Sequence, residues 1–170
     1  MKINLKELVA FGMLGGVMFI SKLVMDAFPN IHLLAMLTIS FALVFRQKAL
    51  YPILVFVSLL GVTSGFAPWW VPHLYLWFIL WGAAMLIPKG MNKTAKAILC
   101  VVLCAAHGFL YGVMYAPAQA LMYGMNFKAM VAWILAGIPF DITHGLGNLV
   151  VGFLILPMER ALNIAKKVLH

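Results

Sequence analysis

Residues 31–66, IHLLAMLTISFALVF-RQK-ALYPILVFVSLLGVTSGF, decide the fold because they hold two long apolar runs joined by a short basic turn. The runs are residues 31–45 and 49–66, and the turn is Arg46-Gln47-Lys48. Apolar runs of this kind predict membrane helices, and Lys and Arg collect in cytoplasmic loops. The stretch therefore predicts a helical hairpin whose tight turn faces the cytoplasm. The first run, of 15 residues, is short for a membrane span, and snorkelling of Arg46 and Lys48 or local thinning of the bilayer would close the gap.

The other basic residues extend this pattern along the whole chain. Of the 12 Lys and Arg, only Lys22 and Lys128 lie outside alternate gaps and chain ends. The pattern predicts an all-α integral membrane protein with six transmembrane helices and cytoplasmic N and C termini. The basic residues at the ends and alternate gaps are Lys2, Lys6, Arg46, Lys48, Lys89, Lys93, Lys96, Arg160, Lys166 and Lys167.

Proline, glycine and charge set the predicted helix boundaries. Phe28-Pro29-Asn30 ends the first helix, and Ala116-Pro117 ends the fifth, because proline cannot continue a helix. Gly137 suits the C-cap of a short helix, and Pro139 suits the first turn of the sixth span. The predicted spans are 5–27, 31–45, 49–66, 74–87, 94–115 and 139–156, with a short helix at 128–136 in a long outer loop.

Composition supports a single membrane-embedded domain covering residues 1–170. The chain is 65% hydrophobic and 9% charged, more apolar than a water-soluble domain of this length can hide. Its formal charge of +8 is explained by a basic rim facing anionic lipid, without a nucleic-acid partner. We therefore expect a multi-pass protein of the cell membrane.

Two features of the chain have ordinary explanations. Cys100 and Cys104 are four apart in a predicted helix, which is poor disulfide geometry, so we expect two small core residues. The first 25 residues resemble a signal peptide, but Lys22 follows the apolar stretch and no A-x-A cleavage site appears. A retained first helix is the better interpretation.

The few polar residues are concentrated in the predicted outer half. An ionisable group inside a membrane is costly and suggests function. Asp141, His144 and Asn148 are three and four residues apart, so they share one helix face. His107, Tyr111 and Tyr115 share a face of the fifth helix in the same way. Together the two faces predict a pocket open to the outside. Other outer-half residues are Asp26, Asn30, His32, Trp69, Trp70, His73, Tyr75, Gln119, Asn126, Lys128 and Trp133.

Each of these candidates also has a structural explanation. Trp69 and Trp70 suit an interfacial aromatic belt. His107 suits an interhelical hydrogen bond, and Lys22 suits a structural ion pair with Asp26. Asp141 suits a cap or a charge that complements a helix dipole.

A metal site is a further alternative. It would use two histidines and one carboxylate, namely His107, His144 and Asp141. No P-loop, G-x-S-x-G, H-E-x-x-H or dinucleotide fingerprint occurs, so the sequence encodes no energy source. An importer built on this chain would need an ATPase partner or an ion gradient.

Two stretches resemble a known family. Gly137-Ile138-Pro139-Phe140-Asp141-Ile142-Thr143-His144-Gly145 is similar to the start of helix 6 in substrate-binding S components of energy-coupling factor (ECF) transporters. Riboflavin-type members have G-I-P-F-N-x-x-K-G there. Gly12-Met13-Leu14-Gly15-Gly16 resembles the A-x-x-x-A feature with which the family docks on its transmembrane T component. Length, six spans and inside termini agree along the chain.

The resemblance implies an all-helical substrate-capture subunit of an importer for a vitamin or related micronutrient. It implies a T component and two cytosolic ATPases as partners, and no catalysis or cofactor in this chain. Asp141 and His144 replace the ligand-contacting Asn and Lys, so the substrate need not be riboflavin; pyrimidine, pyridine and corrinoid ligands stay open. Gly12 and Gly16 are the implied docking residues. A stand-alone carrier and a small membrane enzyme with a His/Asp metal site are the alternatives. The expected substrate-binding residues are Asp141, His144, Asn148, His107, Tyr111, Trp69, Trp70 and His73.

Overall fold

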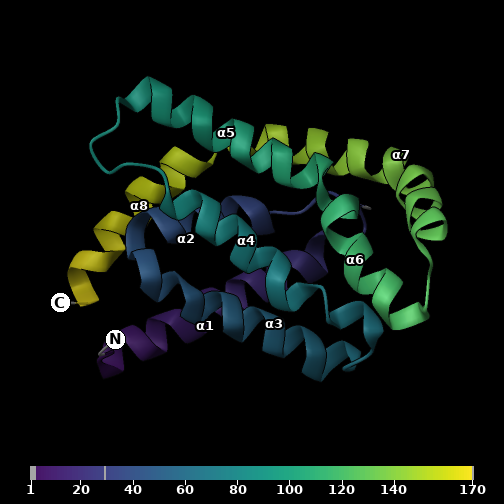
Figure 1. The fold of residues 1–170 in the computed structure, drawn as a ribbon. Coiled ribbons are helices and arrows are strands. Elements are labelled where there is room, and N and C mark those ends of the chain that lie inside the picture. Colours follow the sequence, from purple (N-terminus) through teal and green to yellow (C-terminus); the bar gives the residue numbers. More distant parts are fainter. Residues whose placement is uncertain (1–2, 29, 170) are drawn as a thin grey trace.

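The computed structural model describes residues 3–28 and 30–169. Lys2 and Pro29, which the sequence analysis used, lie outside this range. The described residues form helices joined by short turns, with no strand among them (Figure 1). The elements are α1 (Leu5–Met25), α2 (Leu34–Phe45), η1 (Arg46–Ala49), α3 (Leu50–Ser64), η2 (Pro68–Trp70), α4 (His73–Met85), α5 (Lys93–Phe109), α6 (Tyr111–Tyr123), α7 (Phe127–Gly152) and α8 (Ile155–Leu169).

Four helical segments in the described chain are long and apolar enough to cross a membrane. Two of them are α1 and α7. The segment Leu34–Ser64 comprises α2, η1 and α3, and Lys93–Tyr123 comprises α5 and α6. This supports the all-helical, membrane-embedded fold class, whereas the count of six spans and the orientation of the termini stay predictions.

Polar contacts gather the basic turns and both chain ends at one end of the bundle. Lys48 Nζ, in the turn between α2 and α3, lies 2.6 Å from Glu7 Oε1 on α1. Lys96 Nζ on α5 lies 2.5 Å from Glu159 Oε1 on α8. Figure 1 shows both termini at this end, near the turn that leads into α5. The gaps that carry Lys and Arg in the sequence thus lie at one end of the fold, and the gaps between them lie at the other end.

The core forms around α2, in which nearly every residue is buried. This helix packs against α4 and α8, while α1 pairs with α3 and α5 pairs with α7. Such an all-round apolar helix is expected at the centre of a bundle. Phe41 and Ile39 of α2 have no exposed surface, and Phe56 of α3 and Trp77 of α4 complete the centre.

The predicted fifth helix is divided differently in the structure. We expected one helix over residues 94–115 with a break at Pro117, but α5 ends at Phe109 and α6 continues through Pro117. The break lies at Leu110, and two residues later the Gly112 N–H donates to Asp141 Oδ1 on α7, at 3.0 Å. A contact from a distant helix therefore satisfies one of the free N–H groups at the start of α6.

The short helix at 128–136 and the sixth span from Pro139 are also corrected. Both belong to α7, which runs without interruption through Gly137 and Pro139. Proline is tolerated inside membrane helices where local adjustments satisfy the freed backbone groups. The glycines with a positive φ that end helices are Gly65 after α3 and Gly124 after α6, and Gly137 is not among them. Asp141 and His144 consequently lie in the middle of a long helix rather than in its first turns.

Two further points concern the core and the C-terminal segment. Cys100 and Cys104 are free and buried in α5, as expected. The amphipathic helix α8 was not anticipated by the sequence analysis. It packs on α2 through buried Ile155 and Leu162, and Lys166 Nζ donates to the Val44 carbonyl at 3.0 Å.

Candidate functional site

Four of the five histidines come from separate elements and gather in the half of the bundle away from the basic turns. His32 precedes α2, His73 begins α4, His107 is on α5 and His144 is on α7. The ring centroids of His32 and His144 are 4.6 Å apart, and those of His107 and His144 are 6.4 Å apart. Imidazoles that are far apart in the sequence therefore lie close together in the structure.

Trp77 is the aromatic centre of this cluster. Its ring centroid lies 5.4 Å from that of His107, 6.2 Å from that of His32 and 6.4 Å from that of His73. Phe56 packs edge-on against it at 5.8 Å from the other side. Trp77 is 1% exposed, so its position is fixed by packing on every face.

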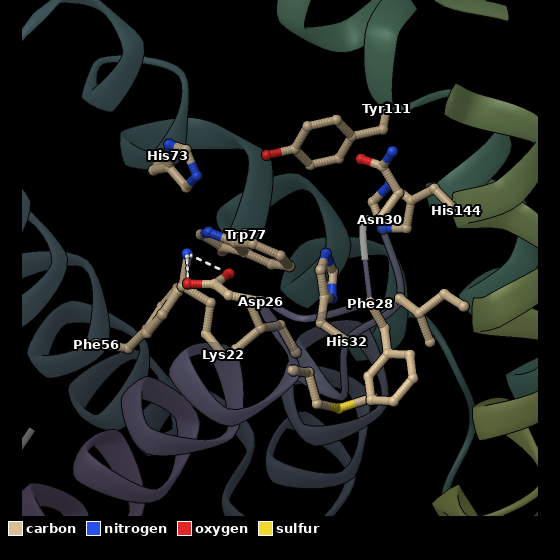
Figure 2. Close-up of a pocket in the computed structure, with 13 residues that line it drawn as sticks. Lys22, Asp26, Phe28, Asn30, His32, Phe56, His73, Trp77, Tyr111 and His144 are labelled. Atoms are coloured by element: carbon tan, nitrogen blue, oxygen red, sulfur yellow. Dashed lines mark hydrogen bonds and ion pairs between the residues drawn. The ribbon is translucent and has the colours of Figure 1, made fainter. Parts of the chain in front are cut away.

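A cavity of about 200 Å³ lies beside these rings. Figure 2 shows the rings of His73, Trp77, Tyr111, His32 and His144 around it, with Lys22 and Asp26 at one side. The wall thus combines aromatic area with polar edges, which is typical of a small-molecule site. The lining residues are Lys22, Met25, Asp26, Phe28, Asn30, Ile31, His32, Leu34, Phe56, His73, Trp77, Tyr111 and His144.

Several buried polar atoms in the cavity wall, or behind it on His107 and Asn148, have no hydrogen-bond partner in the described part of the chain. They are both ring nitrogens of His107, Nε2 of His144, Nδ1 of His32, Oδ1 of Asn148 and Nε1 of Trp77. Buried polar atoms are nearly always paired in folded proteins, and leaving one unpaired is costly. Their concentration here indicates a place where a bound molecule or water completes the hydrogen bonds.

His32 has a further property that bears on recognition. Burial, followed by the nearby imidazoles of His144 and His107, lowers the pKa of His32 to about 3. The ring is therefore neutral at physiological pH, with one nitrogen that donates and one that accepts. A neutral imidazole of this kind can recognise the edge of a heteroaromatic ring.

Lys22 and Asp26 form an ion pair at the side of the cavity. Lys22 Nζ lies 2.8 Å from Asp26 Oδ1 and 2.9 Å from Oδ2, one helical turn apart on α1. The structural contact expected between them is confirmed. It also places a cation and an anion within reach of a ligand.

The two polar helix faces predicted from the sequence do meet. His144 of α7 lies 4.9 Å from Tyr111 of α6 between ring centroids, and His107 lies 5.8 Å from Tyr111. Asn148 is one turn deeper, where its Nδ2 donates to the Cys104 carbonyl at 3.1 Å. These four predicted site residues form one cluster, and His73 joins it through its contact with Trp77.

Asp141 occupies a different position from the one expected. It does not line the cavity, and its carboxylate accepts the Gly112 N–H at the start of α6. A carboxylate at a helix N-terminus is favourable, because it satisfies a free N–H group and complements the helix dipole. The capping role considered for Asp141 is thus present, but on a neighbouring helix instead of its own.

Trp69 and Trp70 lie beside the cluster and support it. Trp70 Nε1 donates to the Val57 carbonyl at 2.8 Å. The Trp69 carbonyl accepts from the Tyr115 hydroxyl at 2.9 Å, and it lies 3.2 Å from His73 Nδ1. Neither indole lines the cavity. These contacts hold the turn between α3 and α4 in place under His73.

Sequence reasoning missed two members of the site. His32 was recognised as a polar outer-half residue but not selected, because nothing in the chain connects it to His144. Trp77 lies inside an apolar run and carries no polar signal. Its four-residue spacing from His73 would place the two on one helix face, and this spacing could have drawn attention to it.

The metal alternative finds no ready geometry. Among the described residues, no three of His, Cys, Asp and Glu are arranged to hold an ion. Asp141 in particular is directed to Gly112 and not toward His107 and His144.

Comparison with known proteins adds no relative. No protein-family model, no curated protein and no solved structure matches this chain significantly.

Proposed function

We propose that this chain is the substrate-capture subunit of an ECF-type importer in the cell membrane. It binds a vitamin or related micronutrient from the outer side and then tips against a T component driven by two cytosolic ATPases. It performs no covalent chemistry and requires no cofactor of its own.

The observation that carries this proposal is the group of unpartnered buried polar atoms beside a cavity. The cavity lies at the C-terminal end of α1 and the N-terminal end of α4, away from the basic turns. If those turns face the cytoplasm, as the distribution of Lys and Arg predicts, the cavity faces outward. This arrangement suits a protein that captures a solute from outside.

The size and lining of the cavity favour a small ring compound. A volume of about 200 Å³ equals that of roughly seven water molecules in the liquid. Single or fused heteroaromatic rings of the pyrimidine or pyridine kind fit this space, whereas a corrinoid is far larger. Tyr111 and Trp77 supply flat apolar area, and the imidazoles supply donors and acceptors for ring nitrogens and substituents.

The exposed face of α1, which no other helix of the protein covers at Gly12 and Gly16, supports the docking part of the proposal. Added Cβ atoms at Gly12 and Gly16 would meet nothing within 4 Å, and Met13 and Val17 beside them are exposed. Small residues on an uncovered membrane helix let another helix approach closely. Gly15 differs, because it is packed closely against Val55 and the Pro52 carbonyl of α3.

Affinity purification with mass spectrometry of both proteins and small molecules tests the proposal. Copurified ATPases, a T component and a ring compound are the expected result. A tightly held metal ion without these partners would favour the membrane-enzyme alternative. Uptake by this chain alone in vesicles would favour the stand-alone carrier.

Substitutions then test the site with the compound so identified. His144→Ala should weaken binding by about tenfold to a hundredfold, because a lost partner leaves a buried polar group unsatisfied. Asp141→Asn keeps an oxygen acceptor for Gly112, and Asp141→Ala does not. If Asp141 acts only as a cap, the Asn variant retains stability and affinity. If it contacts substrate, affinity falls in both variants while the Asn variant keeps its thermal stability.

A further inference from the structure

A second cavity lies at the opposite end of the bundle, between the turn before α5 and the start of α8. Its volume is about 310 Å³. It belongs to the end that carries the basic turns, so it is far from the histidine cluster. Its lining residues are Lys89, Met91, Lys93, Lys96, Leu156, Glu159, Arg160 and Asn163.

The charges in this cavity do not balance. Lys96 pairs with Glu159, and both side chains are largely buried. Lys89, Lys93 and Arg160 remain as three further cations. The chain has only four acidic side chains, and the other three are engaged elsewhere: Glu7 with Lys48, Asp26 with Lys22, and Asp141 with the Gly112 N–H. No acidic residue of this protein is therefore left to neutralise the cavity.

An apolar groove of about 250 Å³ adjoins the basic cavity. Leu156 lines both spaces, so the groove begins where the cavity ends. It lies between α5 and the junction of α7 with α8, where Gly152 at the end of α7 lies close to Val101. On α5 it extends about 6–14 Å beyond Lys93 by helical rise, which is the depth of the first part of an acyl chain. The groove is lined by Ala97, Ile98, Val101, Val102, Gly152, Phe153 and Leu156.

We infer that this cavity and groove together bind one anionic phospholipid from the leaflet at the end of the bundle that holds both termini. The phosphate group lies among Lys89, Lys93 and Arg160, and one acyl chain follows the groove between α5 and the α7–α8 junction. Basic pockets between membrane helices bind anionic headgroups in this way. A soluble phosphate compound would leave the groove empty, and an acidic protein segment would not need it.

Native mass spectrometry of the purified full chain tests this inference, with phosphatidylglycerol and phosphatidylcholine as probes. The triple variant Lys89→Gln, Lys93→Gln, Arg160→Gln removes the three unbalanced cations. Each basic residue near a membrane surface contributes about fivefold to the affinity for anionic lipid, so the triple variant should lose roughly a hundredfold. Its binding of phosphatidylcholine should not change.

A matched control removes the same charge at exposed sites elsewhere: Lys6→Gln, Lys128→Gln, Lys167→Gln. This variant should retain phosphatidylglycerol binding, and equal losses in the two triple variants would overturn the inference. Val102→Trp fills the groove from an exposed rim position without touching a cation. It should also weaken phosphatidylglycerol binding, and unchanged binding would overturn the acyl-chain part of the site.

Two further measurements complete the test. Glycerophosphoglycerol, the headgroup without acyl chains, should compete poorly; competition as strong as that of the intact lipid would assign the cavity to a soluble phosphate compound instead. Thermal unfolding in lipid-free detergent should be the same for each variant and the wild type, which separates lost binding from lost folding. None of these measurements requires the substrate or the T component, so the lipid site stands or fails independently of the proposed function.

Discussion

Replacing His107 by leucine should leave the empty protein at least as stable as the wild type while removing substrate binding. His107 is 5% exposed, and neither ring nitrogen makes a well-formed hydrogen bond within the described residues, although the Leu76 backbone lies close enough to interact with the ring. A buried polar group without a partner costs about 1–3 kcal/mol. Leucine has a similar volume and no polar atom, so it avoids this cost without opening a large cavity.

The expected gain is about 1–2 kcal/mol, because water in the adjoining cavity satisfies part of the need. For a domain of this size, 1 kcal/mol corresponds to about 2–4 °C in the midpoint of thermal unfolding. His107→Leu should therefore raise the midpoint by about 2–8 °C, measured by tryptophan fluorescence in detergent without ligand. Addition of the copurified compound should stabilise the wild type further but not the variant, since only a bound ligand shifts the unfolding equilibrium.

Trp70→Phe is the matched control, because the Trp70 Nε1 donor is satisfied by the Val57 carbonyl at 2.8 Å. Removing this donor should lower the midpoint, since one hydrogen bond contributes about 1 kcal/mol. If His107→Leu lowered the midpoint as much as Trp70→Phe, His107 would be a structural hydrogen-bond donor. The interpretation of the cluster as an unfilled binding site would then be refuted.

Three other predictions concern packing, docking and topology. Gly108→Ala should destabilise the protein by about 1–3 kcal/mol in thermal unfolding, because the added Cβ would lie 2.8 Å from the Gly145 Cα on α7. Gly137→Ala is the control and should not destabilise the protein, because its Cβ would meet nothing within 4 Å. Equal effects of the two substitutions would contradict the close crossing of α5 and α7. Gly12→Leu or Gly16→Leu should abolish uptake in cells while binding by the isolated protein persists; a parallel fall in binding would assign this face to the pocket or the fold. A cysteine at Gln47 should be labelled only from the cytoplasmic side, and labelling from outside intact cells would reverse the predicted topology.

The arrangement of the two ends was predictable because charge is a local property of the sequence. Basic residues in alternate gaps need no tertiary information to be recognised, and the fold brings Lys48 to Glu7 and Lys96 to Glu159 at one end. The apolar runs likewise fixed most helices to within a few residues. The first predicted span, 5–27, corresponds to α1, and the second and third correspond to α2 and α3.

The divisions of the later helices were not predictable in the same way. Proline and glycine indicate a break only where no tertiary contact compensates for them. In α7 the chain continues through Gly137 and Pro139, whereas the real break, at Leu110, lies beside a contact from Asp141 of another helix. No local pattern around Leu110 contains that information.

Only part of the candidate site could be predicted from the sequence, because helical spacing relates only residues of the same helix. Helical spacing placed His107 with Tyr111, and His144 with Asn148, on shared faces, and the structure joins those faces. Spacing cannot bring a loop residue to a helix far along the chain. His32 therefore joined the site only in the structure, where its ring lies 4.6 Å from that of His144.

The histidine cluster differs from the rest of the protein in how its polar groups are paired. Each of the four carboxylates already has a partner: a lysine for Glu7, Asp26 and Glu159, and a backbone N–H for Asp141. Among the described residues, every buried side-chain polar atom without a partner, apart from Thr38 Oγ1, belongs to Trp77, to its ring neighbours His32 and His107, or to His144 and Asn148 of α7. Apolar side chains at these positions would give a more stable fold, because each unpaired buried polar atom costs free energy. Their concentration in one place is the physical argument for the proposed binding site at this end of the bundle.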